Sequence, residues 1–200
     1  MNILFWAAVV IIFGSALMLL LTDNWRYTLA FLAALYLGVF GLTLTHWALS
    51  MAAVKLVTGW MATTILGITR SALDPQTDSA PKQTLPESNL FRIFAAAILT
   101  LVVTSATPTV MQLLPGIGSA EVAGSLLLMT MSLLHLGLTT EPQRVIVGLL
   151  TFLAGFEILY ASLENSTLVA ALLALINLGL ALVGAYLMIA KPPKEEAPGL

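Results

Sequence analysis

Residues 167–190 read TLVAALLALINLGLALVGAYLMIA, a run without a single charged side chain. A helix rises about 1.5 Å per residue, so roughly 20 apolar residues span the hydrocarbon core of a bilayer. The run is long enough to cross, and nothing in it requires water. We therefore predict a transmembrane helix over 167–190.

The rest of the chain repeats this pattern. Hydrophobic residues make up 59% of the sequence and charged residues only 9%, whereas a water-facing surface normally needs about 25% charged residues. The composition predicts an all-α integral membrane bundle with about seven transmembrane helices. The first segment has no Lys or Arg before its apolar run, so we expect a retained helix and not a signal peptide. Besides 167–190, the apolar segments lie at about 2–22, 27–47, 50–69, 91–113, 119–138 and 144–163.

Two polar stretches divide the chain into units. Residues 71–89 (SALDPQTDSAPKQTLPESN) are rich in Pro, Ser, Asp and Gln, which is typical of a flexible loop. We predict a three-helix membrane unit at 1–70, a cytoplasmic loop at 71–90, a four-helix membrane unit at 91–190 and a cytoplasmic tail at 191–200.

The basic residues predict the orientation. With seven helices, seven of the eight Lys and Arg residues fall on one side of the membrane, and the opposite connections contain none. Cytoplasmic segments carry the excess of Lys and Arg, so the N-terminus is expected outside and the C-terminus inside. The eighth basic residue, Lys55, lies within the third segment. The seven are Arg26, Arg70, Lys82, Arg92, Arg144, Lys191 and Lys194.

Ionisable side chains inside a bilayer are costly, so the few that occur are the main candidates for function. Glu157 lies within the sixth segment, and Lys55 lies at a similar depth in the third, both nearer the outer side. Burial disfavours the charged form of either group, which favours uptake and release of protons by a buried Glu. The two could pair and exchange a proton, as in membrane pumps. The alternatives are a static ion pair that pins two helices, and a Lys55 side chain that extends to the outer interface.

Three further polar residues are weaker candidates for a proton path. Glu164 follows Glu157 on the same helical face and is expected to be solvated at the outer end. Asn177, near the middle of the last segment, suggests a hydrogen bond between helices. His135, near the inner end of the fifth segment, could extend a path inward or be an interface residue.

No motif predicts catalysis or a cofactor. There is no cysteine, no phosphate-binding loop and no zinc-ligand spacing, and we expect no catalytic, cofactor-binding or metal-binding residues. His46 and His135 are predicted at opposite depths, which argues against shared ligation of one metal or haem. No basic patch suggests nucleic acid.

Residues 144–162 (RVIVGLLTFLAGFEILYAS) resemble the K subunit of complex I. A basic residue opens the helix, and the core Gly155-Phe156-Glu157-Ile158 fits that family's Gly-x-Glu-[Ile/Leu] pattern. The resemblance implies that Glu157 is a membrane-embedded proton-pathway residue. The family has a second acid in its following helix, whereas the present chain has Asn177, which cannot carry a proton as a carboxylate does.

The chain as a whole resembles component E of the group-four membrane hydrogenases. That family has a similar length, seven helices, a K-subunit-like C-terminal part and a Lys in its third helix before a basic cytoplasmic end. Lys55 and Arg70 match this placement.

These resemblances imply a non-redox membrane subunit that handles protons or sodium ions within a complex I-like or hydrogenase-like assembly. Its expected partners are antiporter-like and complex I-like membrane subunits and the lipid bilayer, in a bacterial or archaeal cytoplasmic membrane or an equivalent energy-transducing membrane. Two alternatives remain open at this point. One is a structural or assembly subunit without ion transport, and the other is a self-standing transporter of small solutes.

Overall fold

The computed structural model describes residues 2–73, 86–114, 116–164 and 166–190. These residues form seven α-helices and no strand. The helices are α1 (Asn2–Leu21), α2 (Trp25–Thr43), α3 (Leu49–Leu73), α4 (Pro86–Leu113), α5 (Ser119–Gly137), α6 (Pro142–Leu163) and α7 (Thr167–Ala190).

Six of the seven helices, α2 to α7, are long and apolar enough to cross a membrane. The part of α1 whose side chains are described, Phe5–Leu21, is also apolar but shorter than the other six spans. An α-helix satisfies its backbone hydrogen bonds within itself, and this is why helices can cross lipid. The predicted all-helical membrane bundle is therefore confirmed, and the chain is a multi-pass membrane protein.

Three helix ends differ from the sequence-based boundaries. Helix α2 stops at Thr43, where the Thr45 hydroxyl donates to the Leu42 carbonyl at 2.6 Å and the chain turns. Helix α3 continues to Leu73, and α4 already begins at Pro86, a residue type favoured in a first helical turn. The predicted 71–90 loop therefore contains helical residues at both ends, and the predicted 191–200 tail lies outside the described residues.

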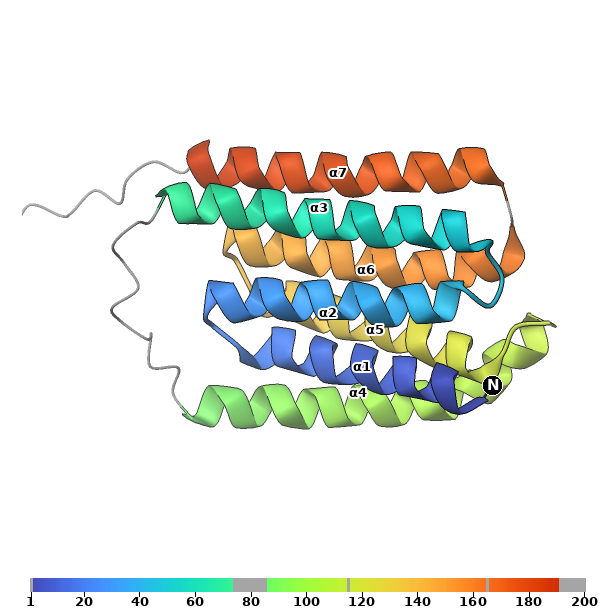
Figure 1. Ribbon diagram of the computed structural model, residues 1–200. Helices are drawn as coiled ribbons and strands as arrows, with labels where there is room; N and C mark the ends of the chain where they lie inside the picture. Colours follow the sequence, from blue (N-terminus) through green and yellow to red (C-terminus); the bar gives the residue numbers. More distant parts are fainter. Residues whose placement is uncertain (1, 74–85, 115, 165, 191–200) are drawn as a thin grey trace, which may run out of the picture.

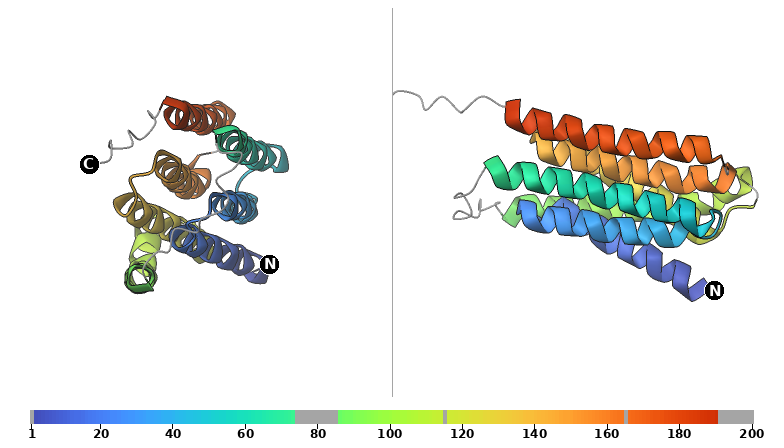
Figure 2. Two further views of the ribbon diagram at one scale, coloured as in Figure 1. Left: turned by 90° about the vertical axis from the view of Figure 1, so that its left-hand side faces the viewer. Right: turned by 45° about the horizontal axis from the view of Figure 1, so that its top comes forward.

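The helices run alongside one another, with α7 and α4 at opposite edges of the bundle (Figure 1). Seen end-on, α6 lies inside the bundle (Figure 2), and it packs against α2, α5 and α7. Helix α3 packs against α2 and α7, and α4 packs against α5 and α1. Because α6 is central, its side chains can meet partners from several helices.

The described basic residues other than Lys55 share one end of the bundle. Arg26, Arg92 and Arg144 lie near the starts of α2, α4 and α6, and Arg70 lies near the end of α3. All four of these helix ends are at the left of Figure 1. We call this the arginine-rich end. Its cytoplasmic location remains a prediction, and Lys82, Lys191 and Lys194 lie outside the described residues.

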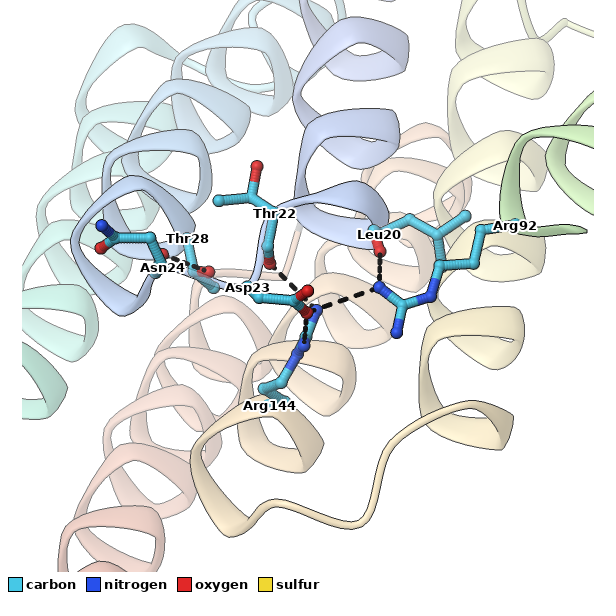
Figure 3. Close-up of polar contacts among 7 residues, drawn as sticks. All are labelled: Leu20, Thr22, Asp23, Asn24, Thr28, Arg92 and Arg144. Atoms are coloured by element: carbon cyan, nitrogen blue, oxygen red, sulfur yellow. Dashed lines mark hydrogen bonds and ion pairs between the residues drawn. The ribbon is translucent and has the colours of Figure 1, made fainter. Parts of the chain in front are cut away.

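Asp23 joins three helices at the arginine-rich end (Figure 3). Its carboxylate pairs with Arg144 of α6 and, at 3.5 Å, with Arg92 of α4. The same two arginines donate to carbonyls at the end of α1, Arg92 to Leu20 at 3.1 Å and Arg144 to Thr22 at 3.0 Å.

These contacts provide the cationic cap that the sequence of α1 does not provide at its C-terminal end. The last carbonyls of a helix have no intrahelical partner, and the helix dipole favours a cation there. The last turn of α1 has no basic residue. Arg92 and Arg144 therefore cap α1 from neighbouring helices, while Asp23 balances their charge.

We predict that Asp23→Ala lowers the thermal stability of the chain. Two half-buried arginines would lose their carboxylate partner, at a cost of about 2 kcal/mol, or roughly 4–8 °C in a chain of this size. Thermal unfolding at a fixed heating rate in detergent measures the shift. Arg26→Ala removes an exposed charge at the same end and should change the midpoint by much less. Equal shifts for the two variants would contradict this role of Asp23.

Candidate functional site

The most unusual feature of the bundle is an ion pair between α3 and α6. Lys55 Nζ contacts Glu157 Oε2, and the two side chains are only 5% and 1% exposed. Charged side chains are almost never this buried unless they are paired. The structure thus brings together the two ionisable residues that the sequence places within apolar segments at similar depth.

Two polar side chains complete the site. Asn177 of α7 donates from Nδ2 to Glu157 Oε1 at 3.3 Å, and the Tyr36 hydroxyl of α2 donates to Asn177 Oδ1 at 3.4 Å. Lys55 Nζ lies 5.3 Å from the centre of the Tyr36 ring, within cation–π range. We call these four residues, one each from α2, α3, α6 and α7, the buried polar cluster.

Small residues allow the helices to bring the cluster together. A Cβ added at Gly59, one turn after Lys55, would overlap the ring of Tyr36. Glycine at this position therefore lets α3 approach the tyrosine closely enough for Lys55 to lie over its ring. On the other side of α6, a Cβ at Gly155 would lie 2.9 Å from Leu128 Cβ and 3.0 Å from the Ser125 carbonyl. Close approach of this kind is the usual role of small residues in membrane helices.

The cluster lies in the half of the bundle away from the arginine-rich end. Lys55 and Glu157 are each roughly 9 Å along their helices from the opposite end. Asn177 lies deeper, towards the middle of α7. The cluster therefore extends from the part of the apolar span far from the arginine-rich end towards the centre of the span.

The cluster has the parts needed to bind and release a proton or a small cation. The Glu157 carboxylate has one oxygen on Lys55 and the other on Asn177. The amine and the carboxylate are in direct contact, so a proton can pass between them without water. Gain or loss of one proton changes the net charge of a site surrounded by apolar side chains, where electrostatic effects are strong.

The other predicted path residues lie elsewhere. Glu164 caps the end of α6 with its side chain exposed, and its backbone carbonyl accepts a hydrogen bond from Trp47 Nε1 at 3.2 Å. His135 is buried near the end of α5 at the arginine-rich end, far along the bundle from Glu157. The structure therefore unites Lys55, Glu157 and Asn177 and leaves Glu164 and His135 outside the cluster.

Sequence reasoning missed two polar features. Tyr36 drew no attention because a tyrosine in an apolar segment resembles an interface residue. Glu121 was also missed, although it is buried at the start of α5, pairs with His46 at 2.8 Å and accepts from the Gly118 backbone N–H at 2.9 Å. An acid three residues after a possible N-cap is a known helix-start signal, and it could have identified Glu121.

Within the described ranges, no group of three or more His, Asp or Glu side chains could hold a metal ion. Comparison with protein families, curated proteins and solved structures finds no match for the chain. The fold and the site define the class of the protein. It is a multi-pass helical membrane protein with a buried Lys–Glu pair where several helices meet.

We predict that Lys55 and Glu157 are energetically coupled. Lys55→Met or Glu157→Gln alone leaves one ionisable group buried without its partner, which costs about 3–5 kcal/mol in soluble proteins. The double variant removes both and should recover most of that loss. Thermal midpoints of the four forms in detergent give the coupling, and strict additivity of the two single effects would contradict it.

Proposed function

We propose that the chain is a non-redox membrane subunit that carries protons, or sodium ions, within a complex I-like or hydrogenase-like assembly. Its carrier site is the buried polar cluster, with Glu157 as the group that binds the ion and Lys55 as its charge partner. Other subunits of the assembly move the electrons.

The observation that carries this proposal is the burial of Lys55 against Glu157 in the apolar span. Ionisable residues at such positions in membrane proteins commonly serve ion pathways and proton relays. The resemblance to the K subunit rests on Glu157, which follows Gly155 by two residues. The resemblance to hydrogenase component E rests on Lys55 in the third helix. The cluster adds a hydrogen bond from Asn177 to the carboxylate, and the Tyr36 hydroxyl in turn donates to Asn177.

The presence of Asn177 in α7 restricts which groups can carry the proton in the proposed route. The K-subunit family has a second acid where this chain has an amide, so a relay between two carboxylates is not available here. Lys55 can take that place, because its amine directly contacts the Glu157 carboxylate. The proposed route therefore passes between an amine and a carboxylate.

A structural role is the second candidate, and the closeness of the pair supports it. A fully paired Lys and Glu, further fixed by Asn177, could serve only to hold α3, α6 and α7 in register. Such a pin would need no exchange of protons with either side of the membrane. The two roles make opposite predictions for an isosteric change at Glu157.

Glu157→Gln keeps the shape and the hydrogen bond from Asn177 but removes the titrating group. The change carries the stability cost given above, so we expect less of the parent assembly to form. The assembly that does form should lose redox-driven proton translocation in inverted membrane vesicles by roughly tenfold or more per complex, the effect of losing an essential relay. The matched control is Glu141→Gln, the same change at an exposed position before α6, which should pump normally. Co-purification with the tagged chain in mild detergent monitors assembly.

Normal pumping by an intact Glu157→Gln assembly would overturn the proposed ion path and favour the structural role. Normal pumping by the Lys55→Met/Glu157→Gln double variant, which removes the unpaired charge and its stability cost, would also favour that role. The remaining alternative, a self-standing transporter, predicts solute uptake by liposomes that contain the purified chain only. We expect such liposomes to be inactive.

A further inference from the structure

A second polar site lies near the arginine-rich end, between α1, α5 and α6. It is a small cavity of about 10 Å³, which is room for one water molecule. The lining side chains are Ala16 and Leu19 of α1, Met131, Ser132 and His135 of α5, and Val147, Gly148 and Thr151 of α6.

His135 places an unsatisfied polar atom at this cavity. The side chain is buried, with only 5% of the residue exposed. The ring lies within hydrogen-bonding reach of the Arg144 backbone, but its Nε2 atom has no partner among the described residues. A Cβ at Gly148, also in the lining, would lie 3.3 Å from His135 Cδ2, so the edge of the ring next to Nε2 faces this wall.

Two hydroxyl groups complete the polar lining. Ser132 donates its proton to the Met129 carbonyl and Thr151 donates to the Val147 carbonyl, each at 2.8 Å. A hydroxyl has one proton to donate but can still accept through its oxygen. Ser132 and Thr151 can therefore accept hydrogen bonds at the cavity but have no proton left to offer His135.

We propose that the cavity binds one ordered water molecule, held by His135 Nε2, Ser132 Oγ and Thr151 Oγ1. Water both donates and accepts, so it serves either tautomer. When Nε2 carries its proton, the water accepts that hydrogen bond and donates to both hydroxyl oxygens; when Nε2 is unprotonated, the water donates one proton to Nε2 and the other to one of the two hydroxyl oxygens. Buried waters typically make about three hydrogen bonds to groups that are otherwise unsatisfied. Leaving Nε2 unpaired would instead carry the desolvation penalty of a buried polar atom.

The proposed water extends a polar face of α5. Glu121, Ser125, Ser132 and His135 are all buried and recur at helical spacing along this helix. Leu128, fully buried, interrupts the series between Ser125 and Ser132. We therefore assign the water only to the part of this face nearest the arginine-rich end, and the assignment does not depend on the ion path proposed for Glu157.

Magnetic resonance of the full chain in lipid nanodiscs tests the water. The sequence has two histidines, so ¹⁵N-histidine labelling of a His46→Gln background isolates the His135 ring. We expect a cross-peak between ring protons and water, with the sign of a long-lived bound molecule. Thr151→Val keeps the shape of the side chain and removes one acceptor, and it should weaken the peak. Adding Ser132→Ala should abolish it.

Thr130→Val is the matched control. Thr130 also donates to a carbonyl one turn back, at 2.8 Å, but it does not line the cavity, so its loss should leave the peak unchanged. Thermal midpoints establish that each variant is folded. Absence of the peak in the parent protein, or a peak of unchanged strength in the folded Thr151→Val and double variants, would overturn the proposal.

Discussion

A charge inside lipid needs a partner inside the protein, and this requirement accounts for the way the bundle is built. Lys55 and Glu157 satisfy it by pairing with each other across α3 and α6. Pairing fixes the rotation of both helices, because either side chain turned towards lipid would lose several kilocalories per mole. The close approach of α3 to α2 at Gly59 accompanies this pairing, because it brings Lys55 over the Tyr36 ring.

The same requirement acts differently at the two ends of the bundle. At the arginine-rich end, Asp23 and two arginines join α1, α4 and α6, and the charges also cap the end of α1. At the other end, Glu121 pairs with His46 from the α2–α3 connection. Each cluster therefore ties a connection or a helix end to the central helices, whereas Lys55–Glu157 acts within the span itself.

The sequence predicted the fold class well because long uncharged runs have few other physical solutions. It also located Lys55 and Glu157, since ionisable residues are rare in apolar segments. It could not predict their neighbours, because α3 and α7 are distant in the chain and only the folded bundle brings Asn177 and Tyr36 together. Tyr36 and Glu121 escaped notice for a related reason. An isolated tyrosine or a polar residue near a helix end is ordinary in sequence, and its burial is visible only in three dimensions.

Helix α6 explains how two polar sites can coexist in one small bundle. Successive residues of a helix are about 100° apart around its axis, so Gly155 and Glu157 point in directions about 200° apart. Glu157 faces α3 and α7, while Gly155, like Thr151, faces α5. The buried polar cluster and the cavity at His135 thus lie on different faces of one helix and at different depths. Because the two sites share no side chain, a substitution at one site removes no group from the other, and their roles can be tested separately.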